Sequence, residues 1–138
     1  AARLHASPNG NLGRGMKVGK EEIIGLVVAL ERYVGLDHQA LVEGWNAKAR
    51  WIADELQDVE GLNAKYALNT GGYADVELTW DEAAFPVTAD EVRQRLRDGE
   101  PRLAYDGVTV RTRCLRDSEE VVVAKRLRQL FEEELRGG

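Results

Sequence analysis

The sequence contains few of the residues that form disulfides, metal clusters and proton relays. Cys114 is the only cysteine in 138 residues, which excludes an intramolecular disulfide and a zinc site built from cysteines. His5 and His38 are the only histidines, and they are too isolated for a metal site or a catalytic relay. We therefore expect no metal site. The single cysteine fits a reducing compartment, which predicts a cytoplasmic protein.

Long hydrophobic runs and an excess of positive charge are also absent. The longest apolar run, residues 23–30, is interrupted by Gly25 and is far shorter than the roughly 20 residues of a membrane-spanning helix. The net charge of −5 argues against a bulk attraction to nucleic acid or to anionic lipid. Because Ala1 opens the chain and Met16 is its only methionine, we expect a piece of something longer.

The first half of the chain predicts a loop and two helices. Residues 1–19 are rich in glycine and have a basic centre, so we expect a loop there. From Lys20 to about Val34 the sequence favours a helix that is apolar on nearly every side. Such a helix needs partners on two faces, and we expect it to link this domain to a domain outside the chain. After Gly35, a second, amphipathic helix is expected to end before Gly61.

The rest of the chain, up to residue 138, predicts strands and helices in alternation. Two runs of alternating apolar residues flank residues 69–72 and predict a hairpin with one wet face. Thr88 and Glu91 form a capping box before a short helix. Residues 106–107, Asp-Gly, predict a second hairpin, and Asp117 is expected to cap the last helix. The order β-β-α-β-β-α predicts an α+β two-layer sandwich with a mostly antiparallel sheet.

A basic, glycine-rich segment precedes the first helix. Arg14, Lys17 and Lys20, together with the amides of a helix N-terminus, suit a phosphate or a carboxylate. The segment is no P-loop, because Arg14 stands where that motif needs glycine, and Glu21 stands where it needs serine or threonine. In the alternative interpretation, the glycines only turn the chain and the cations are solvated.

Three arginines form a second candidate site. Arg111 and Arg113 stand two residues apart on an expected strand and so share a face, and Arg102 precedes them. A guanidinium can bind a carboxylate through two parallel hydrogen bonds. A solvent-facing stripe paired with acids is the alternative interpretation. We find no candidate catalytic residue.

Several segments resemble one enzyme family. Residues 11–26, NLGRGMKVGKEEIIGL, resemble the motif that follows the cofactor lysine in the selenocysteine-synthase-like enzymes. These are pyridoxal-phosphate (PLP) enzymes of fold type I, and they include selenium transferases and sugar-acid ammonia-lyases. Residues 76–81, 96–102 and 108–135 resemble the small C-terminal domain of the same family. The family's upstream lysine motif is absent from this chain.

The resemblance implies a C-terminal domain of a PLP-dependent lyase or transferase whose substrate is an amino acid or an amino-sugar acid. PLP is then expected in the intact enzyme but not bound stably to this chain alone. The implied partners are a large N-terminal domain and other copies in a homo-oligomer. Arg14, Lys17 and Lys20 are expected to lie near the cofactor or a substrate phosphate, and Arg102 or Arg113 is expected to bind the substrate carboxylate. A stand-alone ligand-binding or regulatory module is the alternative.

Overall fold

The computed structural model describes residues 19–104 and 108–135, and the predicted loop before Gly19 lies outside them. The chain divides into two compact units, residues 1–37 and 38–138, and each is described by itself. The first unit contains helix α2 (Lys20–Val34). The second contains α3 (His38–Leu56), β1 (Leu62–Leu68), β2 (Ala74–Trp80), α4 (Ala89–Asp98), β3 (Thr109–Val110) and α5 (Glu119–Gln129). A 3₁₀ turn, η2 (Thr112–Cys114), precedes α5, and a π-helical turn, η3 (Leu130–Glu134), follows it.

Helix α2 has the extent that the sequence predicts. It begins after Gly19 with two acidic residues in its first turn, where carboxylates favour the helix dipole. It ends at Gly35, whose N–H donates to the carbonyl of Glu31 at 3.1 Å. No residue of α2 is buried, and its large apolar side chains are between 47% exposed, at Val28, and 80% exposed, at Val34. The expected helix with an apolar surface in need of partners is therefore present.

The second unit is built on a three-stranded antiparallel sheet of order β1-β2-β3. The register of the first hairpin pairs Leu62 with Trp80, and β2 pairs with β3 at Val76 and Val110. Gly72, with φ 79°, supplies the left-handed conformation that the turn needs. Alternate residues of β2 are buried, as predicted for a sheet with one wet face.

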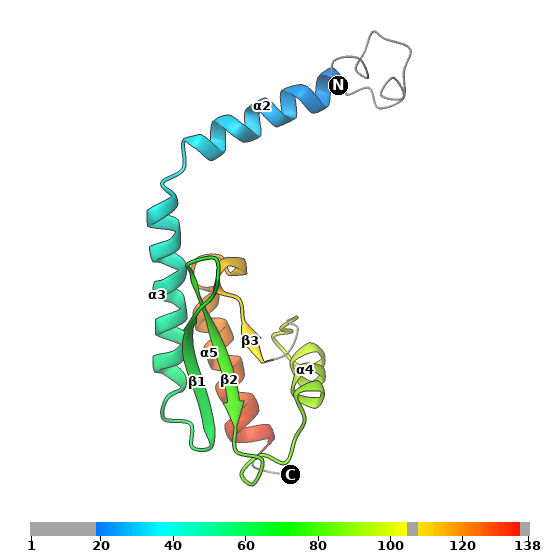
Figure 1. Cartoon of the computed structure of the whole chain (residues 1–138). Helices are drawn as coiled ribbons and strands as arrows, with labels where there is room; N and C mark the ends of the chain where they lie inside the picture. The colour runs from blue at the N-terminus through cyan, green and yellow to red at the C-terminus, as the bar shows by residue number, and fades with distance from the viewer. Residues whose placement is uncertain (1–18, 105–107, 136–138) are drawn as a thin grey trace, which may run out of the picture. The chain divides into compact units, whose positions relative to one another are not determined.

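The two long helices of this unit cover the buried face of the sheet. Helix α3 packs on β1 and β2 and against α5 (Figure 1). Apolar side chains at helical spacing close the core, among them Ile52 and Leu56 of α3 and Val123 and Leu127 of α5. Phe131, in η3, packs edge-on against Phe85 with ring centroids 5.2 Å apart. The predicted α+β class is confirmed.

The prediction of a second hairpin is wrong for the described part of the chain, which has one strand, β3, between α4 and α5 instead of two. The N–H of Leu103 donates to the carbonyl of Leu96 at 2.8 Å, and this bond ties the segment to α4 instead of to a strand. Strand β3 is short because the backbone turns into η2, where the buried Thr112 hydroxyl donates to the carbonyl of Ala74 at 2.7 Å. Residues 105–107 lie outside the described residues. Arg113 therefore stands in η2 and does not share a strand face with Arg111.

The start of α5 also differs from the prediction. Its N-cap is Ser118, with φ 69°, and not Asp117. The Asp117 carboxylate instead pairs with Lys48 of α3 at 3.2 Å. The Lys48 ammonium also donates to the carbonyls of Leu115 and Arg116, at 3.1 and 3.0 Å. One lysine thus fastens the loop before α5 to α3, and this long-range contact overrides the local capping preference of Asp117.

Candidate functional site

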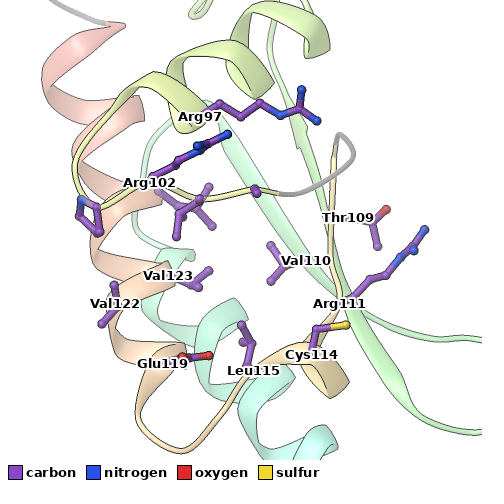
Figure 2. Close-up of a pocket in the computed structure, with 14 residues that line it drawn as sticks. Arg97, Arg102, Thr109, Val110, Arg111, Cys114, Leu115, Glu119, Val122 and Val123 are labelled. Carbon is purple, nitrogen blue, oxygen red and sulfur yellow. The ribbon is translucent and has the colours of Figure 1, made fainter.

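A pocket of about 680 Å³ opens in the second unit, between the end of α4, strand β3 and helix α5 (Figure 2). We call it the arginine pocket, after the three arginines that line it. Its lining comprises Arg97, Pro101, Arg102, Leu103, Ala104, Thr109, Val110, Arg111, Cys114, Leu115, Glu119, Val122, Val123 and Leu127. Such a volume suits a small organic molecule.

The floor of the arginine pocket is apolar. Val110 of β3 and Val123 and Leu127 of α5 belong to the hydrophobic core and also line the pocket. Because these side chains are fixed by core packing, the floor is rigid. The pocket therefore offers a firm apolar surface to the body of a ligand.

The charged groups that line the arginine pocket are mostly cationic. Three arginines and one glutamate line it, in a chain whose net charge is −5. Glu119 accepts a hydrogen bond at 2.8 Å from the backbone N–H of Arg116, so its carboxylate is engaged at the start of α5. Arg111 has an interaction partner. Within the described part of the chain, no hydrogen bond or ion pair engages the side chain of Arg97 or Arg102. The local charge favours an anionic ligand.

The structure separates the two arginines that the sequence proposes for a carboxylate. Arg102 lines the arginine pocket, whereas the guanidinium of Arg113 lies 5.2 Å from the ring centroid of Tyr73 and does not line it. Arg97, which the sequence analysis missed, accompanies Arg102. In sequence Arg97 is one of several charged residues on a short polar helix, and only the return of the chain from Leu103 to Leu96 brings the two arginines to one pocket.

The three N-terminal candidates for a phosphate contact do not line the arginine pocket as far as the structure describes them. Lys20 is the first residue of α2 and is exposed. Arg14 and Lys17 lie outside the described residues, so their expected contacts with a phosphate stay predictions.

A buried arginine holds the end of α4 next to the pocket. Arg126 of α5 is 2% exposed, forms an ion pair with Glu134 of η3, and donates to the carbonyl of Arg95 at 3.2 Å. A Cβ at position 99 would overlap the Arg126 guanidinium, so Gly99 gives it room. Positive charge at the last carbonyls of a helix stabilises the helix dipole. Arg126 therefore fixes the turn of chain that carries Arg97.

The two carboxylates with clearly shifted pKa values have structural explanations. The backbone N–H and the hydroxyl of Thr88 donate to Glu91, which holds the pKa of that carboxyl below its ordinary value of 4.5. The Arg128 guanidinium lowers the pKa of Asp58 below its ordinary value of 3.8. Neither group lines the arginine pocket. The shifts therefore mark a helix cap and an ion pair, and not a catalytic carboxyl.

Among the described residues, no lysine lines the arginine pocket, and the Lys48 ammonium of α3 is already shared by three oxygen acceptors. In residues 19–104 and 108–135, no group of three or more histidine, cysteine or acidic side chains is placed to hold a metal ion. None of the described helices is long and apolar enough to span a membrane.

Known proteins similar to this chain include two enzymes and one solved structure. No family model matches the chain. It is 28% identical over 130 residues to a D-glucosaminate-6-phosphate ammonia lyase of Salmonella typhimurium, and this match covers 88% of the chain and 34% of the relative. It is 29% identical over 129 residues to a 5'-C-glycyluridine monooxygenase-decarboxylase of a Streptomyces species, covering 87% of the chain and 32% of the relative.

The fold agrees with the sequence comparison. A solved structure of D-glucosaminate-6-phosphate ammonia-lyase superposes with a TM-score of 0.66 and 25% identity, over 88% of this chain and 34% of that one. The chain thus spans about a third of the length of the relatives that it matches. Sequence and fold together confirm the predicted resemblance of this chain to the C-terminal domain of the selenocysteine-synthase-like PLP-dependent enzymes.

Proposed function

We propose that this chain acts as the C-terminal domain of a cytoplasmic PLP-dependent lyase or transferase whose substrate is an amino acid or an amino-sugar acid. In this role it shapes the substrate pocket and an oligomer interface, and it has no activity alone. The observation that carries the proposal is the match, in both sequence and fold, of 88% of this chain to a third of an ammonia-lyase. PLP supplies the electron sink for such chemistry when it is bound to the intact enzyme.

Helix α2 supports a role within a larger protein. Its exposed apolar side chains lie all round the helix, and burying such surface contributes about 25 cal/mol per Å². An apolar helix surface of this kind is a docking surface for another domain or another subunit. We assign it to the large N-terminal domain of the intact enzyme and to its homo-oligomer interface.

Within the proposed enzyme, Arg102 binds the substrate carboxylate. It lines the arginine pocket with a guanidinium that has no partner in the described part of the chain, which favours it over Arg113, whose guanidinium lies over Tyr73. Lys20, together with Arg14 and Lys17, contacts the phosphate of the cofactor or of the substrate. An exposed lysine at the start of a helix suits that contact, because helix N-termini favour anions.

The proposal is tested by comparing this chain with the longer protein read from the same gene. We expect an in-frame upstream domain with a cofactor lysine, PLP retained by the longer protein after borohydride reduction, and no stoichiometric retention by the 138-residue chain. Ammonia release from amino-sugar acids should need the longer protein. Stoichiometric PLP retention by the 138-residue chain, or an upstream sequence without such a domain, would overturn the proposal.

A stand-alone ligand-binding module is the second candidate. It is favoured by one observation, that every residue lining the arginine pocket belongs to the second unit. A start codon directly upstream of the region encoding this chain, with ligand binding by the chain alone, would favour this module over the enzyme domain.

A further inference from the structure

The arginine pocket holds two positive charges that no carboxylate of the described residues neutralises. Arg97 stands in the last turn of α4 and Arg102 in the segment that follows, and Figure 2 shows both side chains extending along the same side of the pocket. In the described part of the chain, no carboxylate pairs with either guanidinium. Several charged side chains near the pocket are paired, including Arg126 with Glu134 and Lys48 with Asp117. Arg97 and Arg102, which are both exposed, are therefore the two cations of the pocket lining for which the described residues supply no carboxylate.

A single carboxylate does not match this charge. A carboxylate carries one negative charge, so a monoanion neutralises one of the two guanidinium charges and leaves one positive charge uncompensated. A phosphate monoester carries close to two negative charges at neutral pH, and a dicarboxylate carries two. Among the described residues, Glu119 is the one acid that lines the pocket, and its carboxylate already accepts a backbone hydrogen bond.

We infer that the arginine pocket binds a small organic dianion, a phosphate monoester or a dicarboxylate, through Arg97 and Arg102 together. The uncharged body of the ligand lies on the apolar floor formed by Val110, Val123 and Leu127. This inference rests on the proposed function for the role of the pocket as a substrate site, and it adds Arg97 as a second anion-binding residue. It narrows the substrate class to acids with two negative charges.

The test is a methyl NMR titration of the 138-residue chain at pH 7.5 and low salt, with three probes of similar size: butyl phosphate, succinate and butyrate. The methyl groups of Val110 and Val123 report on the pocket floor. We expect both dianions, or one of them, to saturate these shifts with a Kd about tenfold below that of butyrate, as for one added charge-assisted hydrogen-bonding pair. A preference for succinate assigns two carboxylates and agrees with the carboxylate contact proposed for Arg102, whereas a preference for butyl phosphate assigns a phosphate head and replaces that contact.

Three variants with the same change of charge separate a local site from a general charge effect. Arg97→Gln should raise the Kd of the preferred dianion about tenfold and leave that of butyrate nearly unchanged. Arg102→Gln should weaken all three probes. Arg113→Gln removes one positive charge over Tyr73, outside the pocket lining, and should change each Kd less than twofold. Circular dichroism of each variant checks that the fold is retained.

Equal affinities for butyrate and both dianions would overturn the inference. So would an absence of saturable shifts with every probe, or an equal effect of Arg97→Gln and Arg113→Gln. Because the titration uses the chain alone, such a failure leaves the proposed enzyme role to be decided by PLP retention in the longer protein. Conversely, if the chain binds a dianion but the longer protein retains no PLP, the proposed enzyme role is rejected and the proposed dianion site stands.

Discussion

The ion pair between Arg126 and Glu134 gives a sharp prediction, because its two side chains differ in their access to water. The Arg126 side chain is 1% exposed and the Glu134 side chain is 32% exposed. If the carboxylate is removed, the guanidinium stays buried, with the carbonyl of Arg95 as its remaining hydrogen-bond acceptor in the described residues. If the guanidinium is removed, the carboxylate turns to solvent. We therefore predict that Glu134→Ala destabilises the fold more than Arg126→Met does.

The magnitudes follow from the burial of each partner. Removing one member of a fully buried ion pair costs about 3–5 kcal/mol, because a buried charge is left without compensation. Water at the partly exposed carboxylate screens this pair, so we expect Glu134→Ala to cost about 2–3 kcal/mol. Arg126→Met replaces the arginine with an apolar side chain of similar length and loses the bond to Arg95, at a cost of about 1 kcal/mol.

Urea unfolding at pH 7, followed by far-ultraviolet circular dichroism, measures these differences. The double variant is the decisive sample, because removing both charges removes the uncompensated one. We expect it to be more stable than Glu134→Ala alone, by about 1 kcal/mol or more. If Arg126→Met costs as much as Glu134→Ala, or if the double variant is the least stable of the three, the argument from unequal burial is refuted.

Three further predictions concern the turns, the helix cap and α2. Gly61→Ala should lower the free energy of unfolding more than Gly72→Ala does. Both glycines have positive φ, but of the two only Gly61 would place a Cβ within 4 Å of other atoms. Urea unfolding of both variants compares the losses, and equal losses would count against this steric argument. Because the folded protein lowers the pKa of Glu91, the carboxylate stabilises the fold fully above pH 4.5, and this stabilisation is lost as the pH falls through the pKa of the folded state. Glu91→Gln should therefore flatten the acid side of the curve of melting temperature against pH. An unchanged curve would disprove this. The isolated chain should self-associate through the exposed apolar surface of α2, and Leu26→Glu should suppress this association. Sedimentation velocity at rising concentration measures both. A monomer at every concentration would reject the role of α2 as a docking surface.

Local patterns predicted most of the secondary structure because they were consistent with tertiary packing. The helix from Lys20, the amphipathic helix before Gly61 and the capping box at Thr88 all form where periodicity and capping place them. The failures come from contacts distant in sequence. The Asp106-Gly107 dipeptide predicted a hairpin, but hydrogen bonds from Leu103 to α4 and from Thr112 to β2 leave only a two-residue strand beside it.

The site was harder to predict, because its arginines look alike in sequence. Arg97 and Arg126 each stand among other charged residues on a helix, a pattern typical of a solvated face. In the structure Arg126 is buried against Gly99 and Arg97 lines a pocket, and only tertiary contacts distinguish them from a surface arginine such as Arg116. The sequence proposed Arg102 as one of three arginines able to bind a carboxylate, and the structure adds Arg97, which lines the same pocket.

Helix α5 links the stability of the domain to the geometry of the arginine pocket. Val123 and Leu127 on this helix form part of the pocket floor, and Arg126, between them in sequence, holds the last turn of α4 through the carbonyl of Arg95. The same helix therefore sets both the floor and the position of the chain that carries Arg97. Loss of the Glu134 carboxylate should weaken stability and dianion affinity together, whereas Arg97→Gln should weaken affinity alone. A Glu134→Ala protein that is destabilised but binds the dianion with unchanged affinity would show that the pocket keeps its shape without this buried pair.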